Sequence, residues 1–124
     1  MQTSRMAGVF GGQQVDFLRM RAETLRGHLD AMLLSVLESE PLHGYAIIEA
    51  LKQRSDGELD VPTGTVYPAL RRLERAGFLR SDWSNVGGRE RRTYALTGAG
   101  KRELTAQRGQ WRRVARTVTA FLGN

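Results

Sequence analysis

The spacing of apolar positions predicts two helices in the first half of the chain. The first helix has apolar side chains three or four residues apart: Leu29, Met32, Leu33, Val36 and Leu37. Pro41 is predicted to stop this helix, with a turn at residues 42–44 behind it. A second helix then runs from Tyr45 to about Lys52, and residues 55–57 (Ser-Asp-Gly) end it.

A third predicted helix has the clearest amphipathic pattern. It begins after Pro62, with Thr63 or Thr65 as the N-cap. Its apolar positions follow the i, i+3, i+4, i+7 template: Val66, Ala69, Leu70 and Leu73. Gly77 suits the left-handed position just past the end of the helix. Pro68 lies near the limit of the first turn, where proline is tolerated, so we expect an irregular start.

Two strand-like segments and a long helix complete the pattern. The strands cover residues 79–83 and about 91–96, and residues 84–89 form the hairpin loop between them. Thr97 then caps a helix that continues to Leu122. Three helices followed by a hairpin are the winged helix-turn-helix plan, in which the third helix reads DNA.

The last predicted helix carries an apolar seam with alternating steps of three and four residues. Its members are Leu104, Gln107, Trp111, Val114, Val118 and Phe121. A helix that follows a wing has little of its own domain to cover it, so the seam predicts a two-fold homodimer. Packing onto the first helix of the same domain is compatible with this dimer. A membrane-surface helix over residues 108–122 is the weaker alternative.

These elements predict a mainly α fold with a small β-hairpin, a winged helix-turn-helix plus a C-terminal dimerisation helix. We divide the 124 residues into three parts. Residues 1–27 are expected to be a flexible arm with a short helix near residues 16–26. Residues 28–97 form the DNA-binding domain, and residues 98–124 form the dimerisation helix.

The charges are distributed unevenly along the chain. The net charge is +6, but residues 28–60 carry −5, whereas residues 61–92 carry +4 and residues 93–124 carry +5. A basic half beside an acidic half predicts an oriented surface that faces a polyanion.

Candidate DNA contacts lie on the third helix and the hairpin. Opposite its apolar stripe, the helix presents Thr65, Tyr67, Arg71, Arg72 and Arg75, with Thr63 and Thr65 at its leading end. The hairpin adds Arg89, Arg91 and Arg92 beside two glycines. A solvated helix face and a charged strand edge would explain each set separately. Their combination favours double-stranded DNA as the partner.

Other chemistry finds little support in the sequence. Cysteine is absent, and His28 and His43 have no acidic partner at ligand or triad spacing, so we expect no enzyme, metal or cofactor. The segment at residues 95–102 lacks both the first glycine and the Ser or Thr of a phosphate loop. No apolar run is long enough to span a bilayer, so we expect a cytoplasmic protein without membrane contact.

Five short segments are distinctive in combination: LHGYAII at residues 42–48, TGTVYPALRRLE at 63–74, GFL at 77–79, GRERRTY at 88–94 and LTGAG at 96–100. Together they resemble the PadR family of transcriptional regulators. The similarity covers about residues 25–122, and the single C-terminal helix resembles the short-tailed subfamily. The resemblance implies dimeric regulators, mostly repressors released by small aromatic effectors. It also implies that Tyr45, Thr65, Tyr67, Arg71 and the hairpin arginines contact a palindromic operator.

The sequence allows two interpretations of Trp111 and two of the domain's function. A pair of Trp111 side chains across a dimer axis, flanked by Val114, would form a slot for a flat hydrophobic effector. Alternatively, the tryptophan only fills the dimer core. The rival to a DNA-binding function is a winged-helix protein-interaction module, which would have a neutral or acidic third helix and a hairpin without arginines.

Overall fold

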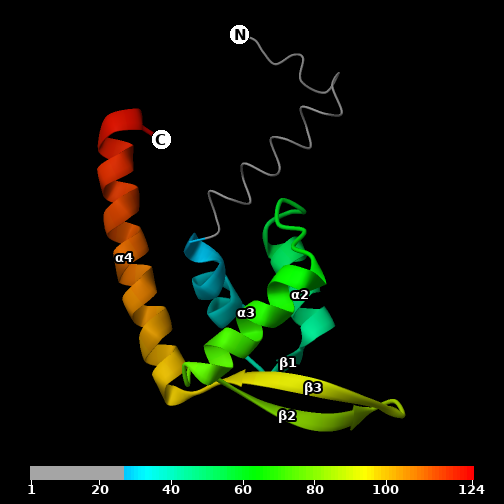
Figure 1. Cartoon of the computed structure of the whole chain (residues 1–124). Coiled ribbons are helices and arrows are strands. Elements are labelled where there is room, and N and C mark those ends of the chain that lie inside the picture. Colours follow the sequence, from blue (N-terminus) through cyan, green and yellow to red (C-terminus); the bar gives the residue numbers. More distant parts are fainter. Residues whose placement is uncertain (1–26) are drawn as a thin grey trace, which may run out of the picture.

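The computed structural model describes residues 27–124 and contains four helices and a small sheet. The described part of the first helix covers residues 27–36. The later elements are β1 (Leu42–His43), α2 (Gly44–Arg54), α3 (Thr63–Arg75), β2 (Leu79–Val86), β3 (Arg89–Leu96) and α4 (Gly98–Leu122) (Figure 1). This is the predicted winged helix-turn-helix with one long helix appended. The arm and short helix expected before residue 27 lie outside the described residues.

The hairpin is longer and its turn tighter than the sequence predicted. β2 and β3 pair without interruption from Leu79 opposite Leu96 to Val86 opposite Arg89. Only Gly87 and Gly88 form the turn, with φ of 59° and 81°. A two-residue turn with two positive φ angles matches the twist of paired strands, and glycine adopts it without strain. The predicted six-residue loop is therefore wrong, because most of it joins the β-ladder. We call β2, β3 and this turn the wing; it projects away from the helices (Figure 1).

The segment before α2 also differs from the predicted turn. Leu42 and His43 form β1, which pairs with Tyr94 and Thr93 of β3, so the sheet order is β1-β3-β2. The first helix ends at residue 36, well before Pro41. The amides of the next two residues bond to carbonyls three positions back, which tightens the chain into a turn. Proline therefore does not end this helix.

The caps of the later helices follow the predictions in part. Gly77 has the expected positive φ, 86°, and the Thr97 hydroxyl accepts a hydrogen bond from the Gly100 amide at 3.0 Å. The N-cap of α3 is Pro62, not Thr63 or Thr65. The Pro62 carbonyl accepts hydrogen bonds from the amides of Thr65 and Val66. α3 continues through Pro68 as one helix.

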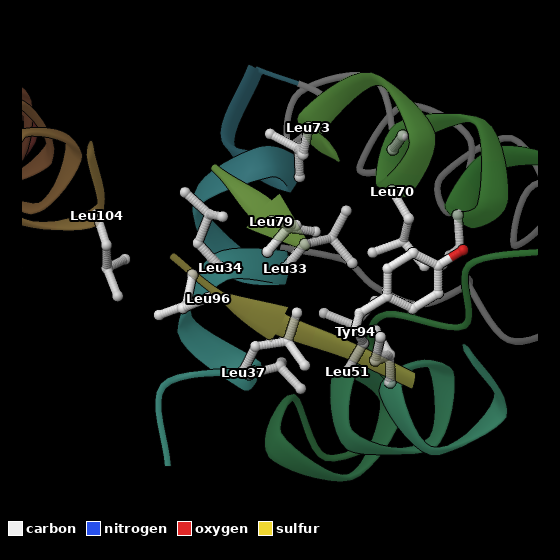
Figure 2. Close-up of a cluster of buried hydrophobic side chains, with 14 residues drawn as sticks. Leu33, Leu34, Leu37, Leu51, Leu70, Leu73, Leu79, Tyr94, Leu96 and Leu104 are labelled. Atoms are coloured by element: carbon white, nitrogen blue, oxygen red, sulfur yellow. The ribbon is translucent and has the colours of Figure 1, made fainter. Parts of the chain in front are cut away.

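One hydrophobic core joins every helix to the sheet. All four apolar positions predicted for α3 are at most 4% exposed. They pack with Leu33 and Leu34 of the first helix, and with Leu79 and Tyr94 of the sheet (Figure 2). Burial of a leucine of this kind contributes about 1.5–3 kcal/mol to folding. Burial also raises the pKa of Tyr94, which keeps its hydroxyl neutral. The stripe of α3 thus fixes which face of that helix reaches solvent.

The start of α4 is attached to the turn that ends α3. The Thr97 hydroxyl donates to the Gly77 carbonyl at 2.6 Å, and the Thr97 amide donates to the Phe78 carbonyl at 3.1 Å. Gly100 lies so close to this turn that a Cβ atom would collide with the Phe78 carbonyl oxygen. Leu104 enters the core from α4 (Figure 2). These contacts hold α4 and α3 in a defined relative orientation.

Candidate nucleic-acid interface

The outer face of α3 is polar and open to solvent. Thr63 and Thr65 are exposed at its N-terminal end, and Arg71 and Arg75 are exposed one turn apart further along. Within residues 27–124, neither arginine has a hydrogen-bond or ion-pair partner. A helix that carries short polar groups in front of free cations can enter a major groove and contact base edges and phosphates.

Arg72 differs from the other α3 arginines. Its guanidinium donates to the Asp30 carboxylate on the first helix, and the two side chains are 54% and 32% exposed. The side chain is therefore engaged in joining α3 to the first helix. Among the α3 residues that we predicted as DNA contacts, it is the one whose side chain has a hydrogen-bond or ion-pair partner in the described chain.

Tyr67 packs α3 against the start of α2. Its ring and hydroxyl lie directly over Gly44, where a Cβ atom would collide with them. The neighbouring Tyr45 is 64% exposed. The N-terminal ends of both helices therefore meet at a surface with two tyrosines, one half-buried and one open to solvent.

The wing arginines occupy three different environments. Arg89 is exposed beside the turn. Arg91 is half-buried, with Nη1 at 3.1 Å from Nε2 and 3.3 Å from Nδ1 of His43. His43 also caps α2, because its Nδ1 accepts from the Ala46 amide at 3.3 Å. Arg92 is exposed and lies over the ring of Trp83, with 5.3 Å between its Cζ and the ring centroid.

A cleft of about 320 Å³ lies where α2, α3 and the wing meet. Its lining consists of Tyr45, Tyr67, Trp83 and residues 89–92, with His43 and Gly44 beside them. Five predicted contacts thus come together there, whereas the exposed threonines and arginines of α3 lie outside the cleft. Trp83 and His43 were missed as site residues. Strand alternation places Trp83 on the same face as Leu79, but only the fold shows that α2 and α3 lie near it.

The described residues contain no group of three or more His, Cys, Asp or Glu side chains that could hold a metal ion. No helix among them combines the length and hydropathy that a membrane crossing requires.

The seam on α4 divides into a buried start and an exposed remainder. Leu104 is 2% exposed in the core of its own domain, so it offers little surface to a second copy. By contrast, Trp111, Val114, Val118 and Phe121 are exposed, the last at 84%. An apolar face of this length in water marks an interaction surface.

A second hollow of about 350 Å³ lies between the first helix and α4. Trp111 contacts His28 there edge to face, with 5.1 Å between ring centroids. Arg108 joins α4 to the turn after the first helix, with hydrogen bonds of 3.0 and 2.7 Å to the Glu38 carboxylate. These bonds hold the pKa of Glu38 below its ordinary value and raise the pKa of Arg108. Val114 does not line this hollow.

Comparisons with known proteins identify one family. The profile described as "Transcriptional regulator PadR-like family" matches residues 33–106. A PadR family transcriptional regulator from Eggerthella lenta is 33% identical, with a TM-score of 0.76 over 91% of this chain and 97% of that one. A PadR family regulator from Clostridium difficile is 34% identical, with a TM-score of 0.68 over 77% and 99%. The transcriptional regulator Rv3488 of Mycobacterium tuberculosis is 47% identical over 58 residues, which are 47% of this chain and 54% of that protein.

Proposed function

The chain belongs to the PadR-like family of transcriptional regulators, and we propose that it is a repressor whose dimer binds a palindromic operator until a small aromatic effector releases it. DNA binding and regulation of transcription follow from the family. The operator symmetry, the direction of regulation, the contact residues and the effector are our proposals.

The arrangement of α3 and the wing is the observation that carries the proposal. The apolar stripe of α3 is buried, so its free arginines, Arg71 and Arg75, face outward. The wing adds three arginines next to the start of the same helix. The helix can therefore read bases from the major groove while the wing neutralises adjacent phosphates. A protein-interaction module without DNA contact would not need this set of cations.

A homodimer is the assembly that the exposed seam supports. Val114, Val118 and Phe121 lie beyond the part of α4 that packs on its own domain, and Trp111 at its edge is still 52% exposed. Pairing this seam with a second copy buries both apolar faces and relates the two α3 helices by a two-fold axis. The half-sites of the operator would then lie about 34 Å apart, one turn of DNA.

The effector site that we propose includes Trp111 and Val114. In the dimer, two Trp111 rings near the axis would form a slot for a planar molecule. The hollow beside His28 supports Trp111 in this role, since Trp111 already lines a cavity there. A ligand there releases DNA only if it binds better to the arrangement of α3 helices that does not fit the operator.

Selection of duplexes from a random library, followed by affinity measurements, tests the proposed function. Arg71→Ala should cost about 1–3 kcal/mol of operator affinity, and alanine at Arg89, Arg91 and Arg92 together should weaken all duplexes and reduce the salt dependence. Arg102→Ala, an exposed arginine on α4, is the matched control. Wild-type affinity in both folded variants would contradict the interface.

The effector proposal is tested separately with planar aromatic compounds. Release of the selected duplex by such a compound should be lost in a folded Trp111→Ala dimer. Unchanged release in this variant would place the effector elsewhere.

A further inference from the structure

Trp83 is a large apolar side chain that lies outside the hydrophobic core. It is 65% exposed on β2, beyond the part of the strand that packs on the helices. A tryptophan with this much exposed surface often marks a binding surface, because its ring offers a large apolar area and its N–H a hydrogen-bond donor. The environment of this ring shows what it could bind.

The pairing of the wing strands places Trp83 on the face that continues from the core. Ser81 is opposite Tyr94 and Trp83 is opposite Arg92, and directly opposed residues share one face of a sheet. Tyr94 is buried against the helices, so the same face reaches solvent at Trp83. Trp83 and Arg92 therefore lie at the edge of the cleft between the wing and the start of α3.

Arg92 is held in place by a short chain of contacts. Its Nε donates to the Ser81 hydroxyl at 3.0 Å, and that hydroxyl donates to the Glu74 carboxylate of α3 at 2.7 Å. The guanidinium lies over the Trp83 ring. Within the described chain, the two terminal amino groups of Arg92 have no partner. An arginine fixed in this way loses little conformational freedom when those groups bind an anion.

The cleft matches one phosphodiester and its sugar in both charge and chemistry. Its three arginines and one glutamate leave two net positive charges, and three aromatic rings provide apolar walls. Phosphate oxygens accept charge-assisted hydrogen bonds from guanidinium groups, and the apolar face of a deoxyribose can pack on an aromatic ring. The cleft also lies beside Tyr67 in the N-terminal half of α3, near where a DNA strand must pass if that helix enters the major groove.

We propose that Trp83 and Arg92 act as a stacked pair at this cleft that receives one backbone phosphate and its deoxyribose from the bound DNA. The inference rests on the proposed DNA-binding function and adds to it. Trp83 is a DNA-contacting residue that the sequence prediction did not include, and Ser81 and Glu74 are positioning residues for Arg92.

A double-mutant cycle on full-length protein tests the pair. Affinity for a selected duplex and for an unrelated duplex is measured over a range of salt concentrations. Trp83→Ala and Arg92→Ala should each weaken both duplexes about tenfold, because a phosphate contact carries no sequence information. The slope of log affinity against log salt should fall in magnitude by about 0.9, as for one lost phosphate. The double variant should be little weaker than either single variant, because the two residues form one contact.

Two further variants serve as controls for the cycle. Trp83→Phe keeps an aromatic ring under the guanidinium and should bind within about twofold of wild type. Arg80→Ala removes an exposed arginine from the same strand, on the other face and outside the cleft, and should change binding little. Equal losses for Arg80→Ala and Arg92→Ala, or additive losses in the double variant, would overturn the proposal.

Fluorescence gives an independent measurement on the intact fold. The chain has two tryptophans, so the signal of Trp83 is obtained as the difference in emission between the wild type and Trp83→Phe. The emission of Trp83 should change when duplex DNA binds, and acrylamide should then quench it less. Full acrylamide access with DNA bound would overturn the proposal. If Arg71→Ala abolishes specific binding while Trp83→Ala binds like wild type, the DNA-binding function stands and this inference alone fails. If the wild type binds no duplex, both fail.

Discussion

α3 and the C-terminal half of α4 are both amphipathic, but only α3 buries its apolar face within the chain. The stripe on α3 has at most 4% exposure, whereas Trp111 and Phe121 on α4 are 52% and 84% exposed. α4 lies to one side of the domain and extends past it, whereas α3 crosses the middle (Figure 1). The same helical spacing of apolar residues therefore gives a buried face on α3 and an exposed face on α4.

This difference separates two roles of an amphipathic helix. Because the apolar face of α3 is covered, its orientation is fixed and its polar face can be aligned with a second molecule. Apart from the contact of Trp111 with His28, the exposed face of α4 is left largely open by residues 27–124, so its stability in water depends on another surface. The core should therefore tolerate changes in α4 beyond residue 108 and respond strongly to changes in α3.

The largest expected effect is loss of core packing under α3. Leu70→Ala removes a fully buried side chain and should lower the free energy of unfolding by about 2–5 kcal/mol. Urea titration followed by circular dichroism measures this change. Val114→Ala, on the exposed seam, is the control and should change the unfolding of the winged domain far less. Similar losses in both variants would contradict the difference in burial between the apolar faces of α3 and α4.

A charge on the seam should break the assembly without unfolding the domain. Val118→Asp should raise the dimer dissociation constant at least about a hundredfold, because the carboxylate would be buried against a second apolar face. Sedimentation over a concentration series measures the dissociation constant, and circular dichroism checks the fold. Lys101→Asp changes the charge at an exposed position near the start of the same helix and should leave the assembly intact. A wild-type dissociation constant for Val118→Asp would place the interface elsewhere.

The joint between the two helices should be sensitive to a single methyl group. Gly100→Ala would force a Cβ atom onto the backbone carbonyl of Phe78, which cannot move without displacing the end of α3. We expect a loss of about 1–3 kcal/mol in the free energy of unfolding.

Gly98→Ala is the matched control for this joint. Its Cβ would meet only the mobile end of Arg102 at 3.6 Å, so it should be neutral or slightly stabilising. Equal thermal midpoints for the two variants would contradict the close approach at Gly100.

The smallest expected effect concerns the ion pair between α4 and Glu38, in the turn after the first helix. Hydrogen bonds from Arg108 lower the pKa of Glu38, so the pair contributes stability above the ordinary pKa of a glutamate. That contribution is lost as the pH falls through the lowered pKa. Both groups are exposed, and the contribution is correspondingly small. The melting temperature of Glu38→Gln should be slightly below wild type at pH 7 and equal to it in acid. A difference that does not change with pH would contradict this account.

Local chemistry was sufficient to predict several features. The stripe of α3, the glycine that ends it and the Thr97 cap each depend on residues within one or two turns. The extent of the hairpin was predicted less well, because strand ends are set by pairing with a partner strand. β1 was missed for the same reason, since two residues have no strand pattern of their own.

The sequence by itself determined the fold class, the order of the elements and the concentration of arginines on α3 and the wing. It did so because helix periodicity, turn glycines and charge are properties of neighbouring residues. The tertiary structure alone decided that Arg72 pairs with Asp30, that Arg91 lies against His43 and that Trp83 supports Arg92 beside α3. The first two contacts join side chains from elements far apart in the chain, and their partners depend on how the core brings those elements together. The third depends on the register of the hairpin and on the packing of β2 beside α3.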